Sequence, residues 1–212
     1  MTSLPRGRHG LSREFIADHQ RGRLFAAVGA VIDRGGYEST TVSAVAGEAG
    51  VSKSDFYAQF ASKDDCFLAA YDAGVERLRV QVLVACRDSD TWAEGICAGL
   101  TAALTGLATD PAQANLLLVE GLRAGPGVYG RYQEAVESFV AQLRDGAPSR
   151  AGAGGPPEAT DEAVVGGIAS LLGRRVSAGE AARLGRFFPE LAEFALSPYV
   201  GVAEARRIIS SR

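Results

Sequence analysis

Helix start signals recur at short intervals along this chain of 212 residues, and they constrain its fold more than any other feature. Thr91–Glu94 and Ser177–Glu180 have the spacing of a capping box, in which a hydroxyl and an acid satisfy each other's free backbone N–H groups. Asp110 precedes Pro111 as an N-cap residue precedes the first helical position. Alternation of apolar and polar residues with period two is scarce, so the sequence predicts an all-α fold without a sheet.

The same signals and the helical spacing of apolar residues set the expected boundaries. Residues 146–160 are rich in Gly and Pro and predict a flexible loop. We expect helices at 12–34, 41–49, 53–59, 63–86, 91–108, 111–122, 127–145, 160–174 and 178–196.

Composition narrows the class of protein. The chain is 47% hydrophobic, which is ample for a core, yet it has no uninterrupted apolar run of about 18 residues. The first residues are basic without a following apolar stretch, so no export signal is expected. Three cysteines without C-x-x-C spacing predict reduced core thiols. We therefore expect a soluble cytoplasmic protein with no membrane association.

Motifs for catalysis are missing. The sequence has no G-x-S-x-G, no phosphate-binding loop and no metal-spaced His and Cys cluster, and its two histidines both fall in the N-terminal region. We expect no enzymatic activity, no catalytic residues, no metal and no cofactor.

Residues 40–60 contain two short amphipathic helices joined around Gly50. Small Ala46 lets the helices cross closely, and Gly50 can adopt positive φ in the turn. This arrangement is typical of a helix-turn-helix whose second helix enters the major groove of DNA. From the spacing alone, an αα-hairpin that only packs is an equal alternative.

The motifs of this region carry a family resemblance. An apolar first helix, G-Y, T-T-V, A-x-x-A-G-V-S, F-Y-x-x-F and S-K-D follow one another without a gap between Leu24 and Asp72. This run closely resembles the N-terminal domain of TetR-family transcriptional regulators. The resemblance implies a basic flexible arm at 1–11, a three-helix DNA-binding domain at 12–62 and an effector-binding and dimerisation domain at 63–212.

The resemblance also accounts for the lysines. The chain has only two, Lys53 and Lys63, and both lie in this motif. In the family, residues at the positions of Tyr57 and Lys63 touch the DNA backbone, while the helix of Lys53 faces the major groove. From side-chain chemistry, we expect Gln59 to pair with adenine and Lys53 with guanine. The full set of expected DNA-binding residues in this domain is Thr40, Thr41, Ser43, Lys53, Ser54, Asp55, Tyr57, Gln59 and Lys63.

Asp55 departs from the family pattern, because many relatives have threonine or serine at this position. Its spacing from Ser52 favours a helix cap, whereas an acceptor for cytosine N4 is the alternative. A charge there also raises a second functional hypothesis, a TetR-like helical ligand- or partner-binding protein that has lost DNA binding.

The arm gives a further DNA contact. Pro5-Arg6-Gly7-Arg8 resembles an AT-hook core, in which two arginines lie along a narrow minor groove. We expect Arg6 and Arg8 to bind DNA in this way, and a disordered basic tail is the alternative.

The C-terminal part supplies two apolar stripes and a set of central aromatic and apolar residues. The stripes fit the helices that pair in the family's dimer, with ordinary core as the alternative: Val164, Ile168, Leu171, Leu172, Phe187, Phe188, Leu191 and Phe194. The family's effector pocket falls among Phe67, Tyr71, Leu100, Leu104, Leu117, Glu120, Arg123, Tyr129 and Tyr132. The resulting hypothesis is a homodimeric repressor that binds a pseudo-palindromic operator on double-stranded DNA and is released by a small hydrophobic or aromatic effector.

Overall fold

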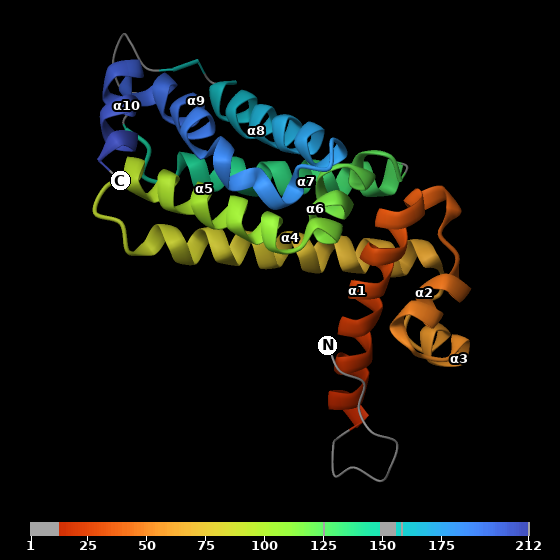
Figure 1. The fold of residues 1–212 in the computed structure, drawn as a ribbon. Helices are drawn as coiled ribbons and strands as arrows, with labels where there is room; N and C mark the ends of the chain where they lie inside the picture. The colour runs from red at the N-terminus through yellow and green to blue at the C-terminus, as the bar shows by residue number, and fades with distance from the viewer. Residues whose placement is uncertain (1–12, 125, 149–155, 158, 212) are drawn as a thin grey trace. The chain divides into compact units, whose positions relative to one another are not determined.

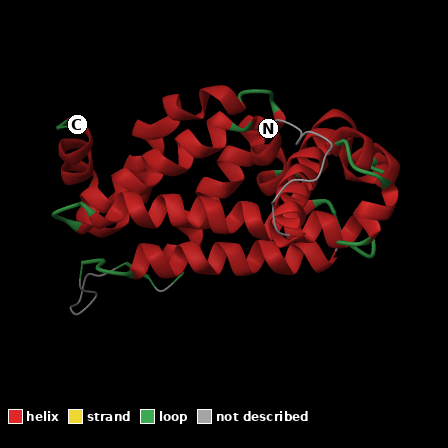
Figure 2. Ribbon diagram, turned by 90° about the horizontal axis from the view of Figure 1, so that it is seen from below, coloured by secondary structure: helices red, strands yellow, loops and turns green. Residues whose placement is uncertain are grey.

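A computed structural model describes residues 13–124, 126–148, 156–157 and 159–211 of the chain. Every regular element in these ranges is helical, which confirms the predicted all-α class (Figure 2). No helix among them is long and apolar enough to cross a membrane. The chain divides into two compact units, residues 1–73 and 74–212, and the division falls inside one long helix.

The first unit contains α1 (Arg13–Ser39), α2 (Val42–Ala49), α3 (Lys53–Tyr57) and the beginning of α4 (Lys63–Arg87). Helix α2 packs against α1 and α3, and all three contribute apolar residues at helical spacing (Figure 1). The buried residues that form this core are Leu24, Ala27, Val28, Ile32, Val45, Ala46, Ala49, Phe56 and Phe60.

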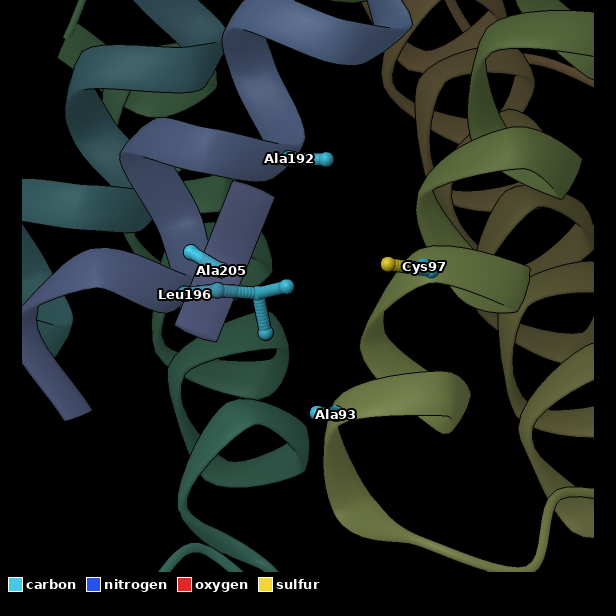
Figure 3. Packing of buried hydrophobic residues seen from close by; sticks show 5 residues of the cluster. All are labelled: Ala93, Cys97, Ala192, Leu196 and Ala205. Carbon is cyan, nitrogen blue, oxygen red and sulfur yellow. The ribbon is translucent and has the colours of Figure 1, made fainter. Parts of the chain in front are cut away.

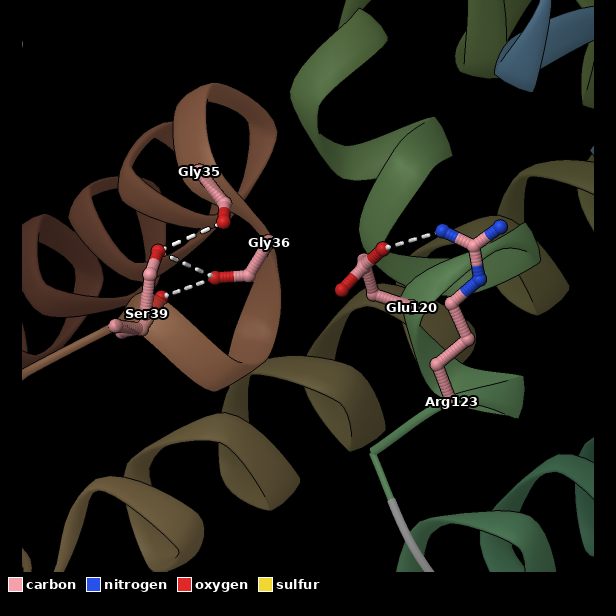
Figure 4. A network of polar contacts seen from close by, with 6 residues as sticks. Gly35, Gly36, Ser39, Glu120 and Arg123 are labelled. Atoms are coloured by element: carbon pink, nitrogen blue, oxygen red, sulfur yellow. Dashed lines mark hydrogen bonds and ion pairs between the residues drawn. The ribbon is translucent and has the colours of Figure 1, made fainter.

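Helix α1 is interrupted near its C-terminal end. The expected end at residue 34 lies close to Gly36, whose φ of 77° is outside the helical region. The Ser39 hydroxyl donates to the carbonyl oxygens of Gly35 at 2.7 Å and Gly36 at 3.3 Å (Figure 4). The Thr40 hydroxyl donates to the Gly36 oxygen at 2.9 Å. These bonds satisfy carbonyl groups that the interrupted helix leaves free.

The second unit consists of the rest of α4 and a set of helices that pack mainly on one another, with α8 contacting α6, α7 and α9. Two short 3₁₀ segments, Glu120–Leu122 and Ala181–Phe187, connect some of them. The α-helices are α5 (Trp92–Thr109), α6 (Pro111–Leu118), α7 (Pro126–Arg144), α8 (Thr160–Ser177), α9 (Phe188–Val200) and α10 (Val202–Ser210).

Two of the predicted start signals are confirmed. The Thr91 backbone N–H donates to Glu94 at 3.2 Å, and the Glu94 N–H donates to the Thr91 hydroxyl at 3.3 Å, so the capping box is complete. Asp110 accepts from the Gln113 N–H at 3.0 Å, with proline at the first helical position.

The capping box predicted at Ser177 and Glu180 is wrong. Ser177 ends α8, and Gly179, with φ of 76°, donates its N–H to the Val176 oxygen at 2.9 Å in a helix C-cap. Glu180 instead pairs with Arg186 and Arg175. The helix expected at 178–196 is therefore a 3₁₀ segment followed by α9, which continues through Pro198 to Val200.

Helix α10 lies beyond the last helix expected from the sequence, at 178–196. Gly201 adopts φ of 83° between α9 and α10, and the two helices pack on each other. Figure 3 shows the small cluster that holds them to α5, in which side chains of α9 and α10 face α5. Its buried members are Ala93, Cys97, Ala192, Leu196 and Ala205.

A buried carboxylate connects α7, α8 and α9. Asp161 is 0% exposed and accepts from Arg144 Nε and the Tyr199 hydroxyl. The Tyr199 ring packs 4.9 Å from the ring of Trp92, whose indole N–H donates to the Leu143 oxygen at 2.9 Å. Because a buried charge is tolerated only when it is paired and hydrogen-bonded, this network fixes the three helices in register.

Helices α8 and α6 approach each other closely at Gly173. A Cβ atom added there would meet the backbone oxygen of Leu118 at 2.9 Å. Gly173→Ala should therefore lower the free energy of unfolding by about 1–3 kcal/mol. Urea denaturation of the full chain measures this.

The matched control is Gly130→Ala in α7, where an added Cβ has nothing within 4 Å. That change should raise the free energy of unfolding by up to about 1 kcal/mol, because alanine loses less backbone entropy in a helix. Equal stabilities for the two variants would contradict the close approach.

Candidate functional site

The turn between α2 and α3 depends on a left-handed glycine. Gly50 has φ of 62° and ψ of 37°, as the sequence predicted for the turn. Its N–H donates to the Gly47 oxygen at 3.1 Å, and the Val51 N–H donates to the Ala46 oxygen at 3.0 Å. The last carbonyl groups of α2 are thus satisfied as the chain reverses into α3.

Helix α3 begins with a reciprocal cap. The Ser52 hydroxyl accepts from the Asp55 N–H at 3.0 Å and donates to Asp55 Oδ2 at 2.7 Å. The Ser52 N–H also donates to Asp55 Oδ2, at 3.2 Å. Asp55 is therefore in the capping position that the sequence favoured, and its charge lies where the helix dipole stabilises an anion.

The exposed side of this helix-turn-helix presents several of the expected DNA-binding residues. Lys53 and Ser54 are exposed in the first turn of α3, and Tyr57 is 57% exposed at its end. The Tyr57 ring packs edge-on to the buried ring of Phe56, with centroids 5.6 Å apart. A rigidly supported phenol and an ammonium group thus point away from the core.

Helix α2 contributes at its N-terminus. Thr41 is the N-cap and accepts from the Ala44 N–H at 3.2 Å, and Ser43 is exposed in the first turn of α2. Thr40 is only 3% exposed, and its hydroxyl holds the turn after α1. Gln59 lies beyond the end of α3, is partly buried, and donates from its amide to Gln20 at 3.5 Å.

Lys63 begins α4, as predicted, and is held by Tyr37. Its Nζ lies 4.5 Å from the centroid of the Tyr37 ring and donates to the Tyr37 backbone oxygen at 3.3 Å. The Tyr37 hydroxyl donates to Asp64. Burial, together with this bond to Asp64, raises the pKa of the phenol, which therefore stays protonated. The role of Tyr37 in positioning Lys63 was not inferred from the sequence.

A second candidate site is a cavity inside the second unit, with a volume of about 180 Å³. It lies among the helices that form the core around Leu143, Val164 and Ala195. The wall is almost entirely apolar: Leu78, Val82, Cys86, Ile96, Gly99, Leu100, Ala103, Leu107, Leu118, Phe139, Gln142, Leu143, Val164, Val165, Ile168, Ala169, Leu172 and Ala195.

Two wall residues carry polar atoms on their side chains. The Cys86 thiol donates to the Gly95 oxygen at 3.2 Å, and burial raises its pKa, so it is a neutral wall group. Gln142 Oε1 is buried and has no hydrogen-bond partner among the described residues. Sequence reasoning missed Gln142, although one polar residue within the apolar face that contains Phe139 and Leu143 was a usable signal.

Among the nine residues expected to form the effector pocket, Leu100 lies on the cavity wall. Phe67 and Tyr71 belong to the first unit and are buried, as are Leu104 and Leu117 in the second. None of these four lines the cavity, and neither do Glu120, Arg123, Tyr129 and Tyr132. Glu120 is buried and pairs with Arg123 at 3.4 Å (Figure 4), while Tyr129 stacks on Tyr132 at 6.3 Å and is half exposed.

The residues expected in the dimer interface differ in how far the single chain buries them. Val164, Leu172 and Leu191 are buried within the single chain, and Ile168 lines the cavity. Phe194 is 43% exposed and lies against Gly167 of α8, where an added Cβ would meet its ring at 3.0 Å. The partly buried members are Leu171, Phe187 and Phe188.

The residues that form the helix-turn-helix match a known family. Residues 24–70 match the model described as bacterial regulatory proteins, tetR family. No curated protein sequence matches the chain. The matched range includes Gly50, Ser52, Asp55, Tyr57 and Lys63, so the geometry above lies within it.

Solved structures resemble the whole fold. The fatty acid degradation regulator FadR from Bacillus halodurans has 16% identity and a TM-score of 0.72, covering 82% of this chain and 97% of that one. FadR from Bacillus subtilis, in complex with stearoyl-CoA, has 18% identity and a TM-score of 0.72, covering 84% and 98%. SmeT, the repressor of the Stenotrophomonas maltophilia multidrug efflux pump SmeDEF, has 16% identity and a TM-score of 0.66, covering 84% and 89%.

The cap of α3 gives a direct stability test. Ser52→Ala removes a hydroxyl that both accepts from and donates to Asp55. We expect a loss of about 1 kcal/mol in the free energy of unfolding, the usual contribution of an N-cap. Urea denaturation checks this, with Ser54→Ala in the same exposed turn as the control. If the control loses as much stability as Ser52→Ala, the capping account fails.

Proposed function

We propose that the chain, whose residues 24–70 match the tetR family model, is a TetR-family transcriptional regulator that represses transcription from a pseudo-palindromic operator as a homodimer. A small hydrophobic or aromatic effector releases it from DNA. As a member of a family of transcription regulators, it is not an enzyme. One observation carries the proposal: residues 24–70, which match the tetR family model, include the two helices that form the helix-turn-helix.

The proposed DNA contacts divide by chemistry. Lys53 and Ser54, exposed at the start of α3, read base edges in the major groove. Thr41, Ser43, Tyr57 and Lys63 bind phosphates and fix the register of the domain. Because Asp55 is engaged in the cap, it gives no support to the alternative of a relative that has lost DNA binding.

Arg6 and Arg8 lie outside the described residues, and their insertion into the minor groove stays a prediction from the sequence. The cavity of the second unit is the proposed effector site. No charged side chain is on its wall, so the cavity offers no ionic partner to a charged ligand such as the stearoyl-CoA of the Bacillus subtilis FadR structure.

Dimerisation is proposed through α8 and α9, where Phe194 leaves part of its ring exposed. A two-fold dimer places two α3 helices about one turn of DNA apart or slightly more. An effector that binds the DNA-free conformation more tightly than the DNA-bound one lowers the affinity for DNA. The decrease is limited by the ratio of the effector's affinities for the two conformations.

Fluorescence anisotropy with DNA flanking the protein's own gene, compared with a shuffled duplex at several salt concentrations, tests the proposal. A regulator binds the native duplex more tightly and shows a steep negative slope of log affinity against log salt. Selection from random duplexes supplies the operator if the flanking DNA does not contain it. Failure of that selection to enrich any sequence would reject the proposed function.

Substitutions separate the two kinds of contact. Lys53→Ala should weaken the free energy of operator binding by about 1–3 kcal/mol and relax the protein's preference for the operator sequence. Lys63→Gln, which keeps a stem over the Tyr37 ring, should weaken binding to every sequence and reduce the salt slope by about one. Arg131→Ala in the second unit is the control. The assignment is refuted if the two lysine variants behave like the control.

The arm has its own test. Arg6→Ala combined with Arg8→Ala should weaken operator binding and lower the salt slope by about two, because two phosphate-neutralising charges are lost. Anisotropy titrations at matched salt measure both effects. An unchanged slope would mean that the arm is a basic tail without a place in the groove.

A further inference from the structure

The cavity of the second unit combines three properties that restrict what it can bind. Its wall carries no Asp, Glu, Lys, Arg or His, so a charged ligand entering it would lose its hydration without an ionic partner. Its volume of about 180 Å³ is slightly larger than the roughly 150 Å³ of an apolar cavity that admits benzene. These two properties point to an uncharged molecule with about one ring.

The third property is the amide oxygen of Gln142. Oε1 is buried without a hydrogen-bond partner among the described residues, while the thiol of Cys86, the other polar wall group, already donates to Gly95. A buried acceptor without a donor is unfavourable in a medium of low dielectric constant. A ligand that brings one donor therefore gains both the apolar contact of the cavity and a hydrogen bond.

Gln142 also marks where the cavity meets the surface. The same residue lines a large groove beside Tyr132 and Gln133 on α7. It lines a smaller groove near Thr91 and Trp92, which shares Cys86 and Ile96 with the cavity wall. An entering ligand therefore passes the Gln142 side chain. Oε1 itself is shielded as the side chain stands, so a turn of the amide brings it to the ligand's donor.

We infer that the cavity binds a small, uncharged, single-ring molecule that donates one hydroxyl or N–H hydrogen bond to Gln142 Oε1, as a phenol does. This inference rests on the proposed function, since it specifies the effector of that same site. Gln142 is thus the residue that determines specificity, and the apolar wall provides affinity without selecting among rings of similar size.

The test uses the full-length chain without DNA and three neutral ligands of similar shape, p-cresol, toluene and 4-methylanisole. Only p-cresol has a hydrogen-bond donor. The single tryptophan, Trp92, packs against the buried cluster of Leu143, Val164 and Ala195, which lie on the cavity wall, and reports binding by its fluorescence. Titration calorimetry gives an independent affinity. We expect p-cresol to bind about tenfold more tightly than the other two, the effect of one hydrogen bond.

Gln142→Leu should abolish this preference while keeping or improving toluene binding. Gln133→Leu is the matched control, because it alters an exposed glutamine on the same helix that is not on the cavity wall. Thermal melts establish that both variants fold. The inference is overturned if the three ligands bind equally, if none binds, if 4-methylbenzoate binds more tightly than p-cresol, or if the preference survives in Gln142→Leu.

A second measurement distinguishes this inference from the proposed function. Adding p-cresol to the protein–operator complex tests release. Gln142-dependent binding without release would support the ligand class and reject effector release through this cavity. Release by another compound, with no binding of p-cresol, would reject the ligand class and leave the regulator intact.

Discussion

The left-handed backbone of Gly50 is the constraint on which the DNA-binding arrangement depends. Any residue with a Cβ is strained at φ of 62°, and here a Cβ would also lie 2.5 Å from Arg23 Nη2. The turn it makes lets α2 end with satisfied carbonyl groups and lets α3 begin at once with the Ser52 cap. Helix α3 is too short to be stable alone, so its cap and the burial of Phe56 together hold the exposed lysine and tyrosine in place.

In the second unit, small residues determine how closely neighbouring helices approach each other. At Gly173 the backbone of α6 lies against α8. At Gly99 an added Cβ would lie 2.8 Å from Cys86 Sγ, so side chains of α4 fill the space beside this glycine of α5. Helices α4 and α5 both contribute residues to the cavity wall. The cavity is therefore a space between helices whose separation is set by close contacts at other positions. The Asp161 network limits how far α7, α8 and α9 can move apart.

The helices and the helix-turn-helix were predictable because their signals are local. The Thr91 cap, the Asp110 cap and the Gly50 turn each involve residues within five positions of one another. Ser177 and Glu180 have the same local pattern, yet Ser177 ends α8, Gly179 makes a C-cap and Glu180 pairs with Arg186, so a competing set of nearby interactions outweighed the pattern. Helix α10 was missed because its place is set by burial of Ala205 against α5 and α9.

By itself, the sequence determined the all-α class, the position of the DNA-binding segment and the candidate contacts at Lys53, Tyr57 and Lys63. Only the tertiary structure decided which apolar residues line the cavity and that Gln142, whose Oε1 is buried without a partner among the described residues, lies on its wall. The physical reason is that caps and turns are short-range hydrogen bonds that are visible in neighbouring residues. A cavity, in contrast, is the space left where side chains from distant helices fail to fill a volume, and helical spacing predicts which residues are buried without predicting which of them meet.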